Sequence, residues 1–435
     1  MKKYILIADP SKVSRFVLEQ YLSDKYNILV STSIAESKRM LSMAVPSIVL
    51  VAYELRDGLG YELCRYVNEK LKNVPVVIIS SEESPERKRM ALESGAIDYI
   101  VRKKIDESIV NYIDEIVELL DMSNLRGSNA IIVQKDSLIT KFTSNVLFSL
   151  GMQVYPFNEE NLSDEQLVAT KPDIIIIDLD IGNENALTLI KNIRKVGSIK
   201  KVPILILTDS RENKMLRSFM LFGANDYTLK PLTTESLILR VTTNIRTKKL
   251  YDYLERVNSE LYTLATTDPL TGLYNRRYII EQLTIMNYNF ERYGNNFSII
   301  IMDLDKFKTI NDTYGHDAGD KVIIDFASKL KDSVRKTDFV GRFGGEEVII
   351  ILQNITEQNL INITQKILTE IRSSNFNYNN FTIKYTASMG VKYCSTYSSS
   401  VDDYIKSADY LLYMSKEKGR DRAHVETTSG IIEIV

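Results

Sequence analysis

The sequence is poor in histidine and cysteine. Its 435 residues include two histidines, His316 and His424, and two cysteines, Cys64 and Cys394. So few ligands argue against zinc sites built from several histidines and exclude cysteine-rich sites. Two thiols far apart in the sequence form no disulfide framework, which is expected of a protein in a reducing cytoplasm.

Neither a charge excess of one sign nor a long hydrophobic run is present. The chain has 55 Lys+Arg and 57 Asp+Glu, a formal net charge of -2. This balance argues against a protein that mainly binds nucleic acid or an anionic membrane. No segment reaches the roughly 18 to 20 apolar residues that span a bilayer, and the apolar run Tyr4–Ala8 is too short for a signal peptide. We therefore expect a soluble, cytoplasmic protein that binds neither nucleic acid nor membrane.

The length predicts two to four domains, and the first half of the chain contains an internal repeat. Pro75–Ser80 recurs as Pro203–Thr208, and Gly95–Tyr99 recurs at the same spacing as Gly223–Tyr227. Each copy alternates short, wholly apolar runs with longer amphipathic segments, which is typical of buried parallel strands covered by helices on both faces. The predicted fold of each copy is a doubly wound, flavodoxin-like α/β domain. The two predicted domains span residues 1–122 and 127–245, with a linker at 123–130.

Both copies resemble the receiver domains of bacterial response regulators. Receivers have an acidic pair after the first strand, an acceptor aspartate after the third, a Thr or Ser after the fourth and Lys-Pro after the fifth. The carboxylates hold Mg²⁺ while one accepts a phosphoryl group, and the lysine offsets the charge. In the first copy these positions are Ala8-Asp9, Ala52 and Arg102-Lys103. Alanine cannot be phosphorylated, so the first copy is predicted to be a degenerate receiver used for packing or dimerisation.

The second copy keeps more of the receiver pattern. It has Asp178 in the acceptor position, Thr208, and Lys230-Pro231. Its acidic pair is replaced by Gln134-Lys135, which removes most of the Mg²⁺ site, and the neighbouring Asp136 could compensate only partly. Two readings stay open: Asp178 is an inert relic, or it is a phosphoacceptor served by a histidine kinase.

Residues 232–267 are predicted to form a coupling helix, because Leu232 to Thr267 contains neither Gly nor Pro. Leucines and a valine recur there at alternating spacings of four and three, the a/d pattern of a coiled coil sustained for about two heptads. A dimeric seam and an amphipathic helix lying on its own domain are the alternatives. The residues of this pattern are Leu250, Leu254, Val257, Leu261 and Leu264.

The region 267–427 carries acidic residues at the ends of predicted strands. The apolar strand Ser298–Met302 ends in Asp303-Leu304-Asp305, and a later strand pair brackets Gly344-Gly345-Glu346-Glu347. Acids at a strand end facing such a hairpin can hold a divalent metal. The two glycines would permit a turn with φ > 0 and let a phosphate approach the backbone. Nearby lysines and arginines would bind a polyphosphate, so the chemistry indicates metal-dependent nucleotidyl transfer.

The order of these motifs resembles the GGDEF family of diguanylate cyclases. The segment Asp268–Arg277 opens the region, and the segment from Ala408 to Arg420 closes it. The resemblance implies an α+β domain with a central, mostly antiparallel sheet, like that of nucleotidyl cyclases. Two receivers, a helix and this domain, in that order, resemble the PleD type of response regulator.

The resemblance also implies a reaction. Two GTP would condense to cyclic di-GMP and two pyrophosphates in a symmetric homodimer, with two Mg²⁺ (or Mn²⁺) ions in each active site. Asp303, Glu346 and the carbonyl of Leu304 would bind the metal, and Glu347 would lie near the attacking hydroxyl or the second metal. The phosphates would be held by the backbone at Phe307 and Lys308, by Gly344 and Gly345, and by the side chains of Lys308, Lys416 and Arg420.

Further residues follow from the same resemblance. Asn311 and Asp320 would read guanine, since the Asp320 carboxylate can accept from N1–H and N2–H₂. Arg335 and Asp338 have the Arg-x-x-Asp spacing of an inhibitory product site, for which a solvated surface turn is the alternative. The sequence departs from the family pattern at Val348, where Phe is usual, and at Asp421, where Asn is usual.

Two other functions are considered. A catalytically silent protein that binds GTP or cyclic di-GMP would not need the metal carboxylates, which are intact here. The receivers alone would suggest a transcription regulator, but the sequence shows no helix-turn-helix motif or basic patch to support one. Residues 428–435 are expected to be a tail.

Overall fold

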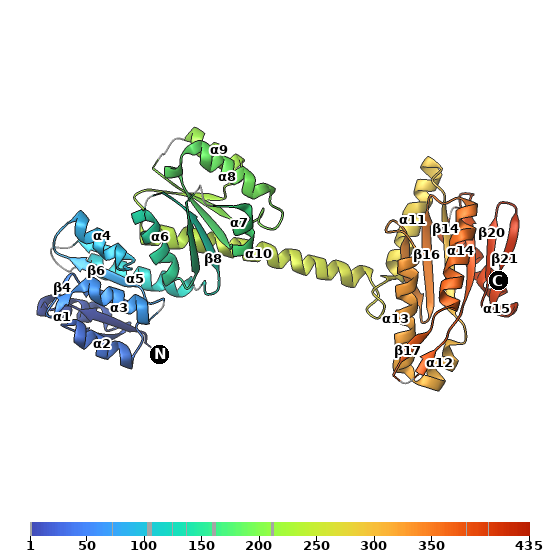
Figure 1. Ribbon diagram of the computed structural model, residues 1–435, viewed down its shortest axis with the longest axis horizontal. Coiled ribbons are helices and arrows are strands. Elements are labelled where there is room, and N and C mark those ends of the chain that lie inside the picture. Colours follow the sequence, from blue (N-terminus) through green and yellow to red (C-terminus); the bar gives the residue numbers. More distant parts are fainter. Residues whose placement is uncertain are drawn as a thin grey trace. The chain divides into compact units, whose positions relative to one another are not determined.

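The computed structural model describes residues 2–71, 73–101, 107–123, 125–135, 137–158, 162–209, 213–379, 381–398 and 400–435. Arg102, Lys103 and Asp136, which the sequence places in the receiver sites, lie outside the described residues. The chain divides into two compact units, Met1–Tyr253 and Leu254–Val435. Figure 1 shows the elements of both units.

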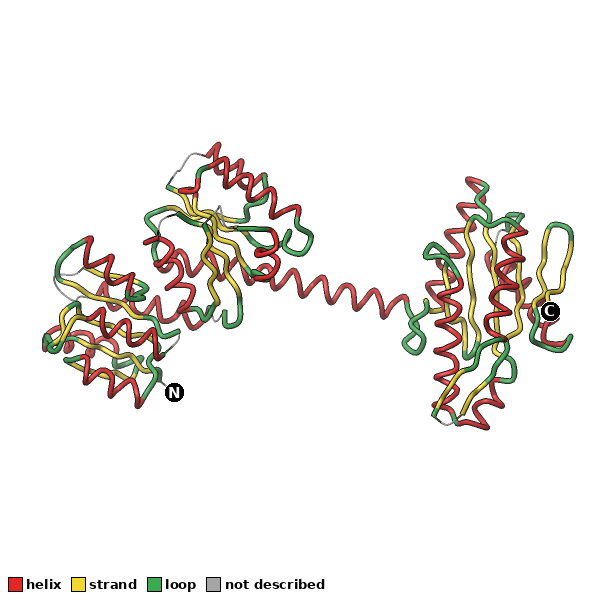
Figure 2. Tube along the Cα trace, in the orientation of Figure 1, coloured by secondary structure: helices red, strands yellow, loops and turns green. Residues whose placement is uncertain are grey.

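The first receiver is a parallel sheet with helices on both faces (Figure 2). Its described elements are β1 (Tyr4–Ala8), α1 (Lys12–Leu22), β2 (Asn27–Ser31), α2 (Ile34–Met43), β3 (Ile48–Ala52), β4 (Glu54–Leu55), β5 (Gly58–Leu59), α3 (Gly60–Lys70), β6 (Val76–Ser80), α4 (Pro85–Glu93), β7 (Asp98–Val101) and α5 (Glu107–Met122). The strand order is β2-β1-β3-β6-β7. Ile5 and Ile7 pack toward α1 and α5, whereas Leu6 packs toward α2, α3 and α4. Burial of alternate side chains on opposite faces explains why the strands are continuously apolar.

The second receiver repeats this fold. Its described elements are β8 (Asn129–Val133), α6 (Ser137–Ser149), β9 (Gln153–Phe157), α7 (Asp164–Thr170), β10 (Ile174–Asp178), the 3₁₀ turn η2 (Leu179–Ile181), α8 (Asn183–Lys195), β11 (Ile204–Thr208), α9 (Asn213–Leu221), β12 (Asp226–Leu229) and α10 (Thr234–Thr266). The strand order β12-β11-β10-β8-β9 is that of the first receiver read from the other edge. The predicted pair of doubly wound domains is therefore confirmed, with Ala52 and Asp178 at the ends of equivalent strands.

The two receivers share a continuous hydrophobic core within the first unit. Buried polar contacts join them as well. The Asn145 amide of α6 donates to the carbonyls of Leu92 (2.8 Å) and Ala96 (2.9 Å) in the first receiver. The Thr234 hydroxyl at the start of α10 donates to the carbonyl of Ile97 at 3.0 Å. The first receiver thus packs against the second receiver of its own chain.

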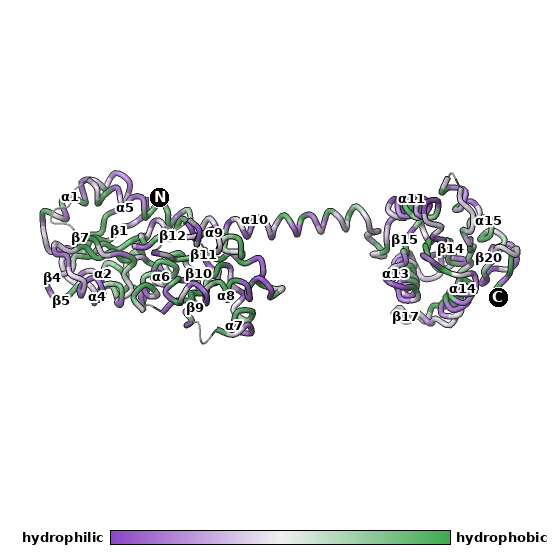
Figure 3. The backbone as a smooth tube through the Cα atoms, turned by 90° about the horizontal axis from the view of Figure 1, so that it is seen from above, coloured by the Kyte–Doolittle hydropathy of each residue, from purple (hydrophilic) through white to green (hydrophobic). Residues whose placement is uncertain are grey.

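Helix α10 changes its surroundings along its length. Leu237, Val241 and Ile245 in its first turns are fully buried in the receiver core. Further along, hydrophobic residues recur on the helix (Figure 3), but they are exposed: Leu254 is 52% exposed and Leu264 is 74% exposed. The helix therefore lies on its own domain only over its first turns, and the leucines of the predicted seam have no cover within the described chain.

The cyclase domain has a mixed, mostly antiparallel sheet, as predicted. Its described elements are β13 (Tyr274–Asn275), α11 (Arg276–Tyr293), β14 (Phe297–Leu304), α12 (Phe307–Tyr314), α13 (His316–Ser333), β15 (Phe339–Gly344), β16 (Glu347–Gln353), α14 (Glu357–Arg372), β17 (Phe376–Tyr378), β18 (Phe381–Ile383), β19 (Ala387–Cys394), α15 (Val401–Glu417), β20 (Ala423–Thr427) and β21 (Gly430–Ile434). The strand order is β13-β15-β16-β14-β19-β20-β21. Strand β14 is central and runs antiparallel to both neighbours.

The two faces of β14 are covered by different helices. Ile299 and Ile301 pack with residues of α11 and α15, whereas Ile300 and Met302 pack with residues of α13 and α14. Because side chains alternate along a strand, Asp303 follows Ile301 onto the α11/α15 face. The strand thereby delivers an acidic side chain to one end of the sheet, next to α15.

The end of the chain corrects one expectation. Residues 428–435, expected as a tail, contain strand β21, which pairs antiparallel with β20 at the edge of the sheet. Across the described residues, no helix combines the length and the apolar character that crossing a membrane requires.

Candidate active site

The predicted acids and a lysine meet at the end of β14. Asp303 lies directly opposite Glu347 in the antiparallel register of β14 and β16. The Lys416 ammonium, from the last turn of α15, forms an ion pair with the Asp303 carboxylate at 3.0 Å. Opposed residues of an antiparallel pair project from the same face. Two carboxylates and a cation are therefore held together by regular secondary structure, which fixes their spacing.

The electrostatics of this cluster disfavour its negative charges. Burial raises the pKa of Asp303, while Lys416 lowers it and Glu346 raises it. Burial also raises the pKa of Glu347, and the charges of Asp303 and Asp409 add to this effect. Crowded, partly buried carboxylates of this kind are stabilised when a cation binds between them.

A divalent metal fits the donor set, although the protein offers an incomplete shell. Among the described residues, no group of three or more His, Cys, Asp and Glu side chains is arranged to hold a metal ion. Asp303, Glu346 and the Leu304 carbonyl are hard oxygen donors, which suit Mg²⁺ or Mn²⁺. Mg²⁺ commonly takes one or two protein carboxylates and completes its shell with substrate phosphates and water. The arrangement is therefore suited to a metal that arrives with a polyphosphate.

The hairpin between β15 and β16 differs from expectation in its backbone. Neither Gly344 nor Gly345 has a φ in the left-handed region, so the predicted φ > 0 turn is wrong. A Cβ on Gly345 would meet no atom within 4 Å, so open space lies beside this turn. The turn could still require glycine for the other predicted reason, which is that a ligand can approach the backbone closely where no side chain is present.

The turn is held by Arg342. Its guanidinium donates from Nε and Nη2 to the carbonyl of Gly345 at 2.9 and 2.7 Å, and from Nη1 to the Asp268 carboxylate at 3.2 Å. Thr271 also donates to Asp268, through its hydroxyl and its N–H. The hairpin is thereby tied to the segment that follows α10.

The backbone predicted to bind phosphate lies at the start of α12. Lys306 precedes the helix with φ 53°, and no side chain caps the helix there. Phe307 and Lys308 begin the first turn, whose N–H groups point outward along the helix axis. The Lys308 side chain is exposed beside them.

The predicted guanine-reading residues lie on neighbouring helices. Asn311 is on α12 and Asp320 is on α13, which packs against it. A Cβ on Gly319 would lie 1.8 Å from Asn311 Oδ1, so a larger residue there would displace the Asn311 side chain. Asn311 Oδ1 is buried against Gly319 and has no hydrogen-bond partner.

The acceptor position of the second receiver is closed. Asp178 is fully buried, and its carboxylate accepts from Lys230 at 2.6 Å, from the Gln134 amide at 3.3 Å and from the Asp180 N–H at 3.1 Å. Burial alone would lower the pKa of Lys230, but its bond to Asp178 holds that pKa above the ordinary value. The negative charge of Asp178 is thus satisfied by the protein itself.

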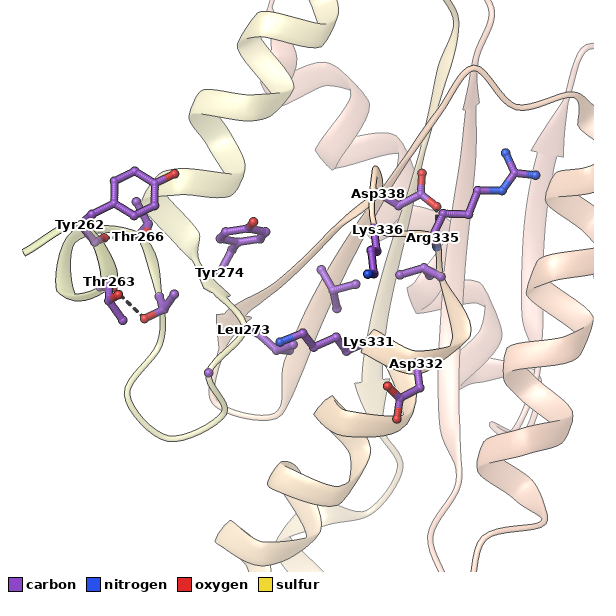
Figure 4. A pocket seen from close by; sticks show the side chains of 14 residues that line it. Tyr262, Thr263, Thr266, Leu273, Tyr274, Lys331, Asp332, Arg335, Lys336 and Asp338 are labelled. Carbon is purple, nitrogen blue, oxygen red and sulfur yellow. Dashed lines mark hydrogen bonds between the residues drawn. The ribbon is translucent and has the colours of Figure 1, made fainter. Parts of the chain in front are cut away.

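Arg335 and Asp338 lie beside a cavity of about 640 Å³ at the end of α10 (Figure 4). The Asp338 carboxylate accepts from the Arg335 N–H at 3.0 Å and from the Gln353 N–H at 3.3 Å. Lys331 and Lys336 extend toward the cavity, whereas the Arg335 guanidinium turns away from it (Figure 4). It borders a second cavity of about 310 Å³.

Sequence reasoning assigned no role to four residues near the active site. Arg342 and Asp268 form the tie described above. Asp409 acts on the pKa of Glu347 from α15, and Arg276 lies over the Phe343 ring at 4.5 Å. Asp268, Arg276 and Asp409 stand inside the motifs that were recognised, but only folding shows which of these motif residues reach the site.

Comparison with known proteins agrees with this domain order. The family model of the response regulator receiver domain matches residues 5–114 and 130–242, and that of the diguanylate cyclase GGDEF domain matches residues 265–422. The chain is 28% identical over 454 residues to the response regulator PleD of Caulobacter vibrioides, covering 97% of this chain and 98% of that protein. It is 35% identical over 169 residues to diguanylate cyclase A of Treponema denticola, covering 38% of this chain and 45% of that protein.

A solved structure is similar to the last domain. The GGDEF domain of DgcB from Caulobacter crescentus, in complex with c-di-GMP, is 31% identical, with a TM-score of 0.35 and coverage of 36% of this chain and 93% of that one. The matches to family models span both halves of the chain. The chain therefore belongs to the response regulators, with two receiver domains followed by a GGDEF diguanylate cyclase domain.

Proposed function

We propose that the chain condenses two GTP to cyclic di-GMP and two pyrophosphates as a homodimer. In each half of the reaction, the 3′-oxygen of one GTP bonds to the α-phosphorus of the other. The bond from that phosphorus to the pyrophosphate oxygen breaks, and the 3′-hydroxyl proton is released. The observation that carries the proposal is the Asp303–Glu347 pair across β14 and β16, with Lys416 on Asp303.

Asp303, Glu346 and the Leu304 carbonyl would hold Mg²⁺ or Mn²⁺, and each active site would contain two such ions. When bound, the metal supplies charge neutralisation at the phosphates and activation of the attacking oxygen. Lys416 forms an ion pair with Asp303, and we infer that its ammonium would also bind the phosphates. Glu347 lies across from Asp303 and would face the attacking hydroxyl.

The triphosphate would lie between the start of α12 and the turn after α15. The Phe307 and Lys308 N–H groups, the open turn at Gly344 and Gly345, and the Lys308 and Arg420 side chains supply donors there. Asn311 and Asp320 would select guanine, because their oxygens match its N1–H and N2–H₂ donors and adenine lacks that pattern.

A homodimer would form along α10. The reaction needs two GTP sites that face each other, and a symmetric pair of chains supplies them. Leu250, Leu254, Leu261 and Leu264 are all more than half exposed and recur at coiled-coil spacing, so pairing with a second α10 would remove their apolar surface from water.

The receivers would act as a scaffold for this dimer. Ala52 offers no phosphate acceptor, and Asp178 is buried and bound to Lys230. We propose that Asp178 is not phosphorylated under ordinary conditions, so a histidine kinase is not needed for activity. The alternative of a silent GTP or cyclic di-GMP effector is disfavoured by the intact acids, which binding alone does not require.

Product would inhibit the enzyme through Arg335 and Asp338. An arginine guanidinium can bind a guanine edge or a phosphate through two parallel hydrogen bonds, and a carboxylate can accept hydrogen bonds from guanine N–H groups. Among the described residues, the side chain of Arg335 has no ion-pair partner, which supports a ligand at this turn. Both Asp338 oxygens already accept from the backbone, so each would accept a second hydrogen bond from product.

The proposal is tested by incubating the purified full chain with GTP and Mg²⁺. Cyclic di-GMP and pyrophosphate should form, and the rate per chain should rise with protein concentration as a larger fraction of the chains is dimeric. A rate per chain that does not vary from dilute to concentrated protein would contradict the dimer requirement unless all chains are already paired, which sedimentation measures independently.

A further inference from the structure

The turn that carries Arg420 has a demanding backbone. Arg420 has φ 65° and Asp421 has φ 50°, both in the left-handed region. Residues other than glycine adopt this conformation at a cost and persist in it only where surrounding contacts hold them. The Arg420 N–H donates to the Ser415 carbonyl at 3.0 Å, which fixes one side of the turn.

Asp305 holds the other side. Its buried carboxylate accepts from the Asp421 N–H at 3.0 Å, from the Ser388 hydroxyl at 2.6 Å and from the Thr386 hydroxyl at 2.7 Å. Asp305 follows the acidic strand end at Asp303 by two residues. The turn is therefore fastened to the same strand that supplies the metal carboxylate.

The Asp421 side chain adds a carboxylate to this turn, and Arg372 is its counter-charge. Arg372, the last residue of α14, donates from Nε to Asp421 Oδ2 at 2.8 Å and from Nη2 to the Asp421 carbonyl at 2.9 Å. The remaining oxygen, Asp421 Oδ1, is buried with no hydrogen-bond partner.

The last strand braces the same turn. Glu433 of β21 pairs with Arg422 at 2.5 Å and with Lys418 at 3.6 Å. Arg422 in turn donates from Nε to the Arg420 carbonyl at 2.9 Å. Lys418 and Arg422 thus share Glu433 as their partner of opposite sign, and Asp421 has Arg372. Among the described residues of this turn, Arg420 is the charged residue for which no ion pair is found.

We propose that Arg372 is a positioning residue for GTP: it neutralises Asp421 and so leaves the Arg420 guanidinium free to bind the triphosphate. An uncompensated Asp421 carboxylate would compete for Arg420 and would repel the phosphates. The inference rests on the proposed function, because it takes Arg420 as a phosphate ligand.

The pair is partly exposed, with 39% of the Arg372 and 34% of the Asp421 side chain accessible. Exposed ion pairs contribute little to folding. Its effect is therefore expected in substrate binding, with the melting temperature almost unchanged.

The test measures binding of 3′-deoxy-GTP with Mg²⁺ to the full chain, together with kcat and KM for GTP. The 3′-deoxy analogue lacks the attacking hydroxyl and reports binding alone. Arg372→Ala should weaken analogue binding and raise KM roughly fivefold, with kcat little changed. Arg372→Lys keeps the charge but lacks the planar fork that reaches Asp421 Oδ2 and the Asp421 carbonyl together, so its effect should be intermediate.

The decisive variant is Arg372→Ala combined with Asp421→Asn. Asparagine tolerates the left-handed backbone and carries no charge, so the double variant should regain wild-type affinity. Asp421→Asn alone should bind like wild type. Lys384→Ala, which removes an exposed lysine after β18, is the matched control and should also bind like wild type.

If the double variant binds as weakly as Arg372→Ala, charge compensation is wrong and Arg372 acts only through structure. If Arg372→Ala binds like wild type, the inference fails outright. Failure of the proposed function looks different, because wild type itself would then make no cyclic di-GMP.

Discussion

Arg342 and Asp268 form an ion pair at 3.2 Å that joins the hairpin of the acidic residues to the segment following α10. The same guanidinium donates to the Gly345 carbonyl in the turn before Glu346. Burial raises the pKa of Asp268, but hydrogen bonds from Thr271 and the charge of Arg342 outweigh it and hold that pKa below its usual value. The carboxylate therefore stays charged. A displacement of the segment that follows α10 would be transmitted through this ion pair to the turn at Glu346.

We predict that Arg342→Ala lowers kcat about tenfold or more, because the hairpin loses the four charge-assisted hydrogen bonds from Arg342 to Gly345 and Asp268. Arg342→Lys should recover little, since an ammonium cannot reach Asp268 and Gly345 together. Circular dichroism should show that both variants stay folded. Steady-state rates equal to wild type in Arg342→Ala would remove this residue from the positioning of Glu346.

Glu347→Gln should stabilise the metal-free protein while reducing cyclase activity. Burial, Asp303 and Asp409 raise the pKa of Glu347, so the folded protein favours its protonated form. Such a group stabilises the fold below its unfolded pKa, and this contribution is lost as pH rises through the folded pKa. At neutral pH the amide therefore relieves an unfavourable charge, a common trade-off at active sites.

The measurement for Glu347→Gln is calorimetry of the metal-free chain from pH 7 downward. The transition of the cyclase domain, identified by its shift with Mg²⁺ and GTP, should be a few degrees higher in the variant at pH 7. The difference should shrink as the pH approaches about 4.5, the ordinary value of a glutamate. A variant that melts lower than wild type at pH 7 would show that Glu347 is stabilising as a carboxylate.

Acetyl phosphate with Mg²⁺ should leave Asp178 unmodified in the wild-type chain. The carboxylate is buried and already bound to Lys230 and Gln134, and the acidic pair that would hold Mg²⁺ is missing. Replacing Gln134 and Lys135 together by Asp should restore phosphorylation, because it returns two metal carboxylates to the site. Intact mass reports both results. Stoichiometric modification of wild type, lost in Asp178→Asn, would mean that another acid completes the site.

Arg335→Ala should keep the initial rate and lose the slowing that follows product accumulation. The Arg335 side chain lies outside the Asp303 cluster, so the first turnovers do not depend on it. Progress curves with and without added cyclic di-GMP measure the effect, and Lys384→Ala serves again as the control. Identical inhibition of Arg335→Ala and wild type would place product elsewhere.

Much of the fold can be predicted from the sequence, because the strands are marked by clear hydrophobic patterns. The run Ile299–Met302 is apolar on both faces and ends in an acid, so the central strand and Asp303 at its end follow directly. Strand β16 pairs antiparallel with β14 in the register that brings Glu347 opposite Asp303. Local pattern and strand pairing thus account for the pair that carries the proposed chemistry.

Other features depend on contacts that no local pattern reveals. Asp409 reaches the cluster from α15, far along the chain, and Arg372 reaches Asp421 from the end of α14. Gly344 and Gly345 suggested a left-handed turn, but the space beside Gly345 explains glycine there without a special φ. The strand β21 did carry a signal, since the apolar Ile431 and Ile432 follow the turn residue Gly430, and the signal was overlooked.

The most direct measurement is the product balance of wild type beside Glu346→Gln. The full chain is incubated with GTP and Mg²⁺, cyclic di-GMP is quantified by mass spectrometry, and pyrophosphate is quantified enzymatically. The account predicts two pyrophosphates for each cyclic di-GMP from wild type, and neither product from a folded Glu346→Gln, because an amide binds Mg²⁺ far more weakly than a carboxylate. Absence of cyclic di-GMP from wild type, or equal yields from the variant, would contradict it.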